Sequence, residues 1–189
     1  MKNLITVLLL VLTVSPLLGQ DYQAGVASKS YQLIGNDTIF PTKSIYENIK
    51  NTSQFTVLTK IFELTNAQEE IDKLGMVTVF LPTDTAFSAY DEKALKKMLT
   101  ASNADALKAA LMRHVIIGRV DQNSLQRNLQ QNGGSAYFRS PADIDPEFKS
   151  GGSQIQLRIP HAAAATITAT NYYHKLGFIH VVDAFLIEQ

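Results

Sequence analysis

The hydrophobic period of the chain changes from helical spacing in its first half to strand-like runs in its second half. Apolar residues at spacings of three and four predict helices over 42–51, 53–65 and 66–75. After residue 134 the chain consists mostly of short β-favouring runs separated by glycine, proline and asparagine. Because helices precede strands instead of alternating with them, the pattern predicts an α+β fold and not a doubly wound parallel sheet.

Capping residues mark the starts of three helices, including those expected over 92–100 and 104–115. Such residues accept hydrogen bonds from the first free amides, and an acidic residue three positions later completes a capping box. The three starts are Asn66 with Glu69, Asp91 alone, and Ser102 with Asp105. Gly75 can end the first of these helices in a left-handed conformation.

Two strands are expected among the helices. The run "VTVFL" at 77–81 is β-branched and aromatic, is too short for a helix, and ends at Pro82. A second strand is expected in "VIIGRV" around Gly118, and a short helix or turn over 124–134. The later strands are expected in "SAYFRS", "SQIQLRIP", "ATITAT" and "FIHVVDAFLI".

The N-terminus is typical of a secretory signal peptide. Residues 1–20 carry one lysine and an apolar run that is too short to span a bilayer comfortably, which predicts cleavage near Gly19. Residues 21–41 are polar and are expected to form a leader that adds an edge strand at most. The remainder, 42–189, is long enough for one domain with its own core.

Composition limits the classes of partner. Seventeen basic residues balance seventeen acidic ones, so no electrostatic footprint for nucleic acid or an anionic membrane is expected. The chain has no cysteine, hence no disulfide. No other stretch reaches the length of a membrane helix, so we expect an exported chain that is secreted, periplasmic or on the cell surface. Asn36 and Asn51 begin triplets that some hosts glycosylate.

Two carboxylates at the ends of apolar strands raise the possibility of an enzyme. One hypothesis for the function is an extracytoplasmic hydrolase or lyase. In that enzyme Asp84, His114, His180 and Asp183 would act as acid or base. No phosphate loop, zinc-binding histidine pair or nucleophile elbow accompanies them, and no cofactor or metal is expected. His180 and Asp183 lie three apart on a strand, where successive side chains alternate, and should face opposite sides.

Structural roles are favoured for these residues. Asp84 is expected to cap the turn after its strand by accepting amide bonds from Ala86 or Phe87, and Asp183 to bind backbone amides at a strand end. His180 is expected to be a hydrogen-bonded structural histidine. His114, on the apolar face of its helix, is expected to be a core residue rather than a metal ligand.

Two further stretches offer candidates for binding. Asp143, Asp145 and Glu147 have the spacing of the first ligands of a calcium loop, but Phe148 stands where that loop needs glycine, and a solvated acidic loop is favoured. Tyr172 and Tyr173 are either a contact surface or part of a tucked-in loop. His114 is a further binding candidate.

Three ordered segments, "TVFLPTDTAF", "LKAALMRHVIIGRV" and "GFIHVVDAFLI", resemble the fasciclin domain in content, order and spacing. The resemblance covers about 42–188. It implies an α+β wedge, or sandwich, of two β-sheets with helices packed alongside, in a non-enzymatic extracellular protein that binds a matrix component, surface glycan or partner protein. The residues to which it implies structural motif roles are Thr83, Asp84, Phe87, His114, His180 and Asp183.

This sequence also departs from the family pattern at several places. Family members that bind cell-surface receptors use a Tyr-His pair, and the corresponding dipeptide here is Arg113-His114. Two loops, 138–153 and 172–176, depart from the family pattern. Because loops carry specific function, these two are expected to hold whatever is particular to this protein.

Overall fold

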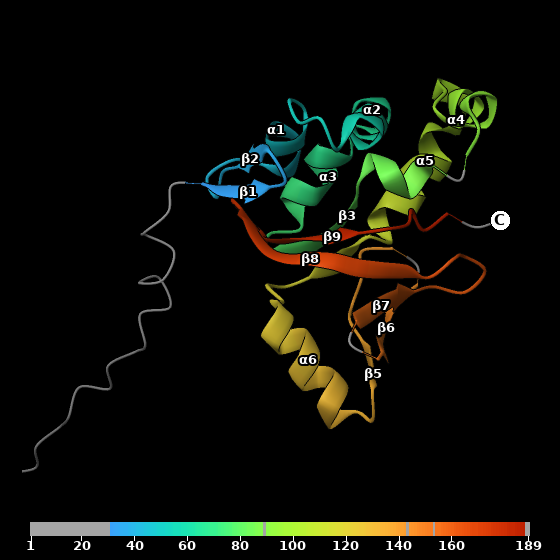
Figure 1. Cartoon of the computed structure of the whole chain (residues 1–189). Coiled ribbons are helices and arrows are strands. Elements are labelled where there is room, and N and C mark those ends of the chain that lie inside the picture. Colours follow the sequence, from blue (N-terminus) through green and yellow to red (C-terminus); the bar gives the residue numbers. More distant parts are fainter. Residues whose placement is uncertain (1–30, 89, 143, 153, 188–189) are drawn as a thin grey trace, which may run out of the picture.

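The computed structural model describes residues 31–88, 90–142, 144–152 and 154–187, so the expected signal peptide lies outside the described residues. The helices are α1 (Ile45–Ile49), α2 (Thr56–Thr65), α3 (Ala67–Lys73), α4 (Glu92–Met98), α5 (Ala104–Met112) and α6 (Gln122–Gln131), with 3₁₀ turns η1 (Asp84–Phe87) and η2 (Ala101–Asn103). The strands are β1 (Gln32–Ile34), β2 (Asp37–Ile39), β3 (Val77–Pro82), β4 (Val115–Ile117), β5 (Ser135–Tyr137), β6 (Glu147–Gly151), β7 (Gln154–Arg158), β8 (Ala165–His174) and β9 (Gly177–Val182). The predicted α+β class is confirmed (Figure 1).

The main sheet has seven strands in the order β4-β3-β9-β8-β7-β6-β5, and only β3 and β9 pair in parallel. The two sheets expected from the sequence are two halves of this one sheet, which share the long strand β8. The amide of Ile117 in β4 donates to the Arg139 carbonyl just after β5 at 2.8 Å. This bond brings the two ends of the strand order together.

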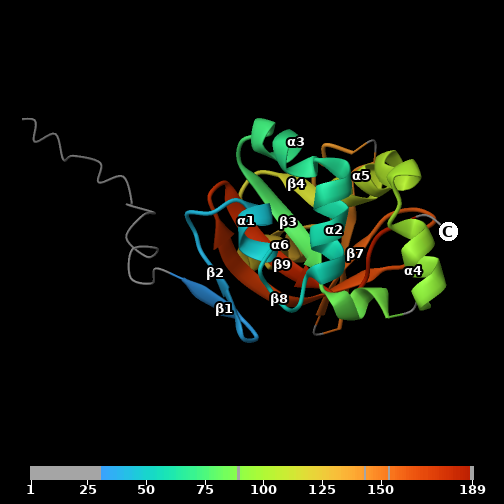
Figure 2. The same cartoon turned by 90° about the horizontal axis from the view of Figure 1, so that it is seen from above.

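Strands β3 and β9 are buried along their whole length and supply side chains to two cores. Val79 and Ile179 point into the core beneath α1, α2, α3 and α5, which lie over the sheet in Figure 2. Phe80 and Val182 point into the second core, together with Phe148. Helix α6 lies on that side of the sheet, away from the other helices (Figure 1). The strict alternation of a strand explains how two adjacent residues serve opposite cores.

Of the three predicted N-terminal helix caps, the structure contains one. Asp91 caps α4 by accepting a hydrogen bond from the Ala94 amide at 2.7 Å, as predicted. Asn66 makes no side-chain cap; its φ of 51° instead ends α2, so the capping box with Glu69 is wrong. The prediction at Ser102 is also wrong, because η2 occupies that position and α5 begins after Asn103.

Two strand predictions need correction. Residues 147–151 form β6, although the acidic stretch was interpreted as a loop. Tyr172 and Tyr173 lie within β8, which continues to His174. Register shifts between Ile167 and Tyr172 let β8 follow β9 through this polar stretch, and such bulges interrupt the alternation on which sequence patterns depend.

The leader forms a β1–β2 hairpin rather than one edge strand. Gln32 fastens it to β8 by donating to the Asn171 carbonyl at 2.9 Å and accepting from the Tyr173 amide at 2.7 Å. In the described part of the chain, every helix is too short or too polar to cross a membrane.

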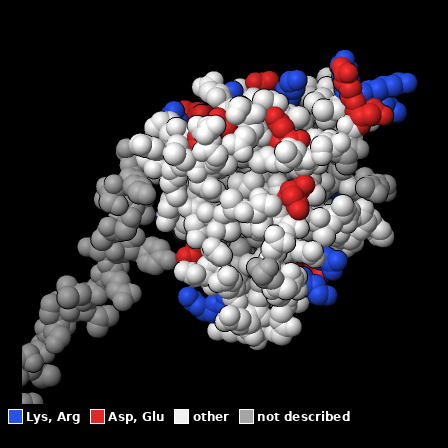
Figure 3. Space-filling model, in the orientation of Figure 1, with Lys and Arg blue, Asp and Glu red and all other residues white. Residues whose placement is uncertain are grey.

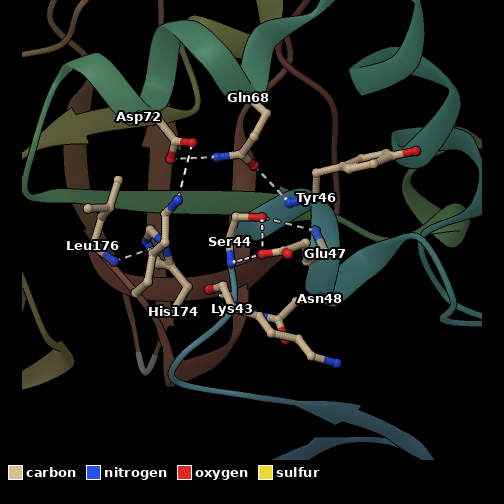
Figure 4. Close-up of polar contacts among 10 residues, drawn as sticks. Lys43, Ser44, Tyr46, Glu47, Asn48, Gln68, Asp72, His174 and Leu176 are labelled. Carbon is tan, nitrogen blue, oxygen red and sulfur yellow. Dashed lines mark hydrogen bonds and ion pairs between the residues drawn. The ribbon is translucent and has the colours of Figure 1, made fainter.

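Polar side chains connect α1 and α3 with the turn between β8 and β9 (Figure 4). Gln68 accepts from the Tyr46 amide and donates to Asp72, and Asp72 also pairs with Lys175 of the turn at 3.2 Å. His174 is buried beside them, where its Nδ1 accepts from the Leu176 amide at 3.5 Å and its Nε2 makes no well-formed hydrogen bond with a described residue. The cluster therefore holds one poorly paired donor in a buried position.

Candidate binding site

The carboxylate of Asp84 caps a helix distant in sequence. It accepts hydrogen bonds from the Thr56 amide at 3.1 Å, the Thr56 hydroxyl at 2.7 Å and the Val57 amide at 2.9 Å. These groups begin α2, whose own N-cap residue Phe55 makes no side-chain cap. The prediction that Asp84 caps its own turn is therefore wrong, because the Ala86 amide already bonds to the Thr83 carbonyl.

His114 is fully buried and bonded at both ring nitrogens. Its Nε2 accepts from the Leu186 amide at 2.8 Å, so Nδ1 carries the proton and donates to the Phe80 carbonyl at 2.9 Å. Burial lowers the pKa of His114 to about 3. The residue lies beyond α5, which ends at Met112, and not on the face of the helix as expected.

His180 and Asp183 also bind backbone groups. The Nε2 of His180 donates to the Val120 carbonyl at 2.9 Å, and burial lowers the pKa of this histidine against the opposing effect of that bond. Asp183 follows β9 and accepts from the Thr166 amide at 2.6 Å. The two side chains thus have separate partners.

The four residues considered for catalysis therefore each form hydrogen bonds with a different part of the backbone. General acid–base catalysis needs at least one such group within reach of a substrate in an open pocket. Neither the pocket beside α4 and α5 nor the pocket beside β5, β6 and β7 is lined by Asp84, His114, His180 or Asp183. Their contacts support structural roles.

The remaining structural-motif residues, Thr83 and Phe87, lie at the two ends of the η1 turn. Phe87 is buried against Phe185, with ring centroids 5.3 Å apart, and the Thr83 and Thr85 hydroxyls lie 2.7 Å apart. Asp143 lies outside the described residues. In the described part of the chain, no three acidic or histidine side chains gather as metal ligands.

The two tyrosines proposed as a contact surface are partly buried in β8. Tyr172 packs against the core under the helices. The ring of Tyr173 lies 4.9 Å from that of Phe178, centroid to centroid. Both side chains are therefore engaged within the fold, which leaves them little free surface for a partner.

A pocket of about 490 Å³ lies beside the ends of β5, β6 and β7. Tyr137, Glu147 and Arg158 line it, and the strand register places Tyr137 opposite Glu147 and Glu147 opposite Arg158. These residues form a polar row across three neighbouring strands, which we call the Tyr137 row. Side chains directly opposite one another in adjacent strands share a face of the sheet. The remaining lining residues are Ile144, Asp145, Ile159, Pro160, Ala162 and Ala164.

The two carboxylates of this pocket have hydrogen-bond partners within the fold, whereas the side chains of Arg158 and Tyr137 extend into solvent. Asp145 accepts from the Ser140 amide at 2.8 Å, and Glu147 accepts from the Ser135 hydroxyl. The side chain of Arg158 is exposed and makes no hydrogen bond or ion pair with any described residue. Tyr137 is 69% exposed, an unusual position for a large aromatic side chain. The pocket thus offers an aromatic face, two carboxylates and a guanidinium to a ligand.

Sequence reasoning named only Asp145 of this pocket as a binding candidate. Glu147 entered as a third member of the calcium-like spacing, while Tyr137 and Arg158 were not identified. Their only sequence signal is a polar or aromatic residue within a β-favouring run, and the row exists only once the register of three strands is fixed.

The helices and the seven-stranded sheet define an α+β domain. Residues 53–188 match the family model of the fasciclin domain, and the chain belongs to the fasciclin family. Over 144 residues it is 25% identical to "Protein sll1483" of Synechocystis sp. (strain ATCC 27184 / PCC 6803 / Kazusa), covering 76% of this chain and 73% of that protein.

The fold also resembles a solved structure of a FAS1 domain pair from the insect cell adhesion molecule fasciclin I. The TM-score is 0.65 at 16% identity, and the match covers 83% of this chain. The chain spans 57% of that solved chain, so the comparison concerns the fold of a part of that pair.

Proposed function

We propose that this chain is an exported, non-enzymatic interaction domain that binds a neutral extracellular polysaccharide at the Tyr137 row. The observation that carries the proposal is the alignment of Tyr137, Glu147 and Arg158 across three strands beside one pocket. Export is supported by the signal-peptide pattern of residues 1–20 and by the family, whose domains are typically extracellular or surface-associated.

The groups of the pocket suit the two surfaces of a sugar. A pyranose ring has an apolar face that can lie on the exposed ring of Tyr137. Its hydroxyl groups can donate to the carboxylates of Asp145 and Glu147 and accept from the guanidinium of Arg158. Two carboxylates beside one guanidinium disfavour an anionic polymer, which is why a neutral polysaccharide is proposed.

A partner protein is the second candidate. Exposed tyrosine and arginine are enriched where proteins bind one another, and Tyr137 and Arg158 are both exposed. A protein partner would need about 800 Å² of surface on this chain. The concave pocket of about 490 Å³ fits a few sugar rings better than such a flat contact.

Affinity electrophoresis of the secreted chain in gels that contain defined neutral or acidic polysaccharides tests the proposal. We expect retardation by at least one neutral polymer, and its loss in Tyr137→Ala and Arg158→Ala. Tyr31→Ala is the matched control, because Tyr31 is 49% exposed and does not line the pocket. Binding that is equally strong in Tyr137→Ala, or that occurs only with acidic polymers, would contradict the proposed site.

A further inference from the structure

A second pocket, of about 640 Å³, lies between α4, α5 and the C-terminal segment 184–187. Met98 of α4, Leu107 of α5 and Phe185 of the C-terminal segment form much of its wall. Five of its lining residues are alanines, whose small side chains leave the volume open: Ala86, Ala94, Ala106, Ala163 and Ala184. We call this pocket the α4 groove.

The groove exists because α4 is a well-formed helix that packs loosely. Asp91 caps its start, and Lys96 pairs with Glu92 on its exposed side at 2.6 Å. Asn103 donates to the carbonyls of Lys97 and Met98 and so satisfies its last turn. Nevertheless α4 buries no residue, and it projects at the edge of the molecule in Figure 1. Protein interiors are close-packed, so an open apolar groove of this size is a candidate ligand site.

The α4 groove has few polar groups. Apart from Tyr90, Lys97 and Asn103, every described residue that lines the groove is apolar, and none of them is acidic. Among the described lining residues Lys97 is therefore the one charged side chain, and it forms no ion pair or side-chain hydrogen bond with a described residue. Figure 3 shows charged side chains gathered over α4, at the upper right of a face that is otherwise mostly uncharged.

These groups favour a ligand with one anionic head. Lys97 and the Tyr90 hydroxyl can donate hydrogen bonds, whereas a cationic head would need a carboxylate, and no described lining residue supplies one. The amide hydrogens of Asn103 are already engaged with the backbone of α4. The rest of the ligand must be apolar, because it would lie against alanine, methionine, leucine and phenylalanine side chains.

We propose that the α4 groove binds one molecule of a long-chain fatty acid, with the alkyl chain between α4 and Phe185 and the carboxylate at Lys97. Each buried methylene favours transfer from water, so a long chain supplies most of the affinity. The carboxylate then selects an anionic amphiphile over a neutral one. This site is separate from the Tyr137 row and does not depend on polysaccharide binding.

Calorimetric titration of the delipidated secreted chain with monomeric palmitate tests the proposal. We expect saturable binding of one palmitate, which Ala106→Phe and Ala163→Phe abolish by filling the groove from two of its walls. Ala109→Phe is the matched control for the first, because Ala109 is an exposed alanine of α5 that does not line the groove. Loss of binding in Ala109→Phe as well, or its retention in both filled variants, would overturn the assignment.

The head group has a test of its own. Lys97→Gln should weaken palmitate binding about tenfold, while Lys93→Gln, which removes the same charge from α4 outside the groove, should leave it unchanged. Hexadecanol should bind the parent about tenfold more weakly than palmitate. Equal affinity for the alcohol and the acid would refute the role of Lys97.

A third readout locates the ligand without relying on affinity. Methyl spectra of methionine-labelled protein should show the Met98 signal shifting with palmitate, while that of Met76, which is 62% exposed and outside the groove, stays fixed. No palmitate binding up to its solubility limit, or binding only to anionic lipid vesicles, would overturn the proposal. The latter result would indicate a membrane surface as the ligand.

Discussion

The carboxylate of Asp84 connects the end of β3 with the start of α2, because it accepts hydrogen bonds from the Thr56 amide at 3.1 Å and from the Thr56 hydroxyl at 2.7 Å. The Asp84 amide donates in turn to the Gln54 carbonyl at 2.8 Å. Helix α2 packs on the core through five buried residues, so its first turn must be held in place over the sheet. Asp84 therefore caps a helix that precedes it in the chain.

Asp84→Ala should destabilise the domain by about 2 kcal/mol, because the first amides of α2 lose their acceptor. The midpoint of urea unfolding measures the change. Asp91→Ala is the control: it also removes an N-cap, but from a helix that buries no residue, and should change global stability by less than about 0.5 kcal/mol. Equal effects of the two substitutions would contradict the role given to Asp84.

His114→Ala should cost about 3 kcal/mol and impair secretion. It leaves the Phe80 carbonyl and the Leu186 amide without partners in a buried place, and it also opens a cavity beside Phe185, on which the imidazole stacks with centroids 5.2 Å apart. His161→Asn, at an exposed residue with φ of 59°, is the control and should be neutral. A His114→Ala protein as stable as the parent would show that these bonds are dispensable.

Some of these relationships could be predicted from sequence, and others could not. The strand "VTVFL" and the cap at Asp91 are local, because composition and a spacing of three residues define them. The partner of Asp84 is not local: Thr56 lies 28 residues earlier, and no periodicity indicates which helix start will reach it. At Asn66 the motif for a capping box is present, but the left-handed conformation that ends α2 takes precedence.

The Tyr137 row could not be predicted from the sequence, because its residues also come together from distant parts of the chain. Tyr137, Glu147 and Arg158 come from three strands, and a shift of one residue in either pairing would turn a side chain to the other face. Strand β6 was itself missed, because its sequence "EFKSG" is polar and only one of its residues is buried. Its pairing with β7 along five residues determines its structure, which local propensity does not.

Gly177→Ala should prevent stable folding. A Cβ at this position would lie 1.9 Å from the Val77 carbonyl oxygen in the parallel pair β3–β9, and neither backbone can move without disturbing a fully buried strand. We expect a loss of about 3 kcal/mol or more, seen as failed secretion or a low unfolding midpoint. Gly151→Ala, whose Cβ would meet only the Gln156 side chain at 3.4 Å, should fold normally. Normal folding of both variants would contradict the close approach of β3 and β9.

Acid should destabilise the domain through its buried histidines, and His174→Phe should reduce that effect. Burial is the main cause that lowers the pKa of His174 to about 4 from its ordinary 6.5; the Val77 carbonyl and Asp72 oppose it, and Arg119 and Lys175 lower the pKa further. Between these values the unfolded chain binds a proton at this residue and the folded chain does not. Stability contributed by His174 is therefore complete above about pH 6.5, and falls by about 1.4 kcal/mol per pH unit as the pH drops toward 4.

The variant isolates this contribution, because the folded and unfolded forms of His174→Phe have nothing to titrate at that position. Urea unfolding of parent and variant at intervals from pH 7 to pH 4 should give a difference in free energy that grows in favour of the variant by roughly 3 kcal/mol across the window. Phenylalanine also removes the Nε2 donor, which makes no well-formed hydrogen bond with a described residue, so the variant should be at least as stable as the parent at pH 7. His114, whose pKa of about 3 is lowered by burial too, remains in both proteins and keeps a pH dependence in each. A constant difference between parent and variant from pH 7 to pH 4 would mean that His174 is protonated in the folded protein as readily as in the unfolded chain.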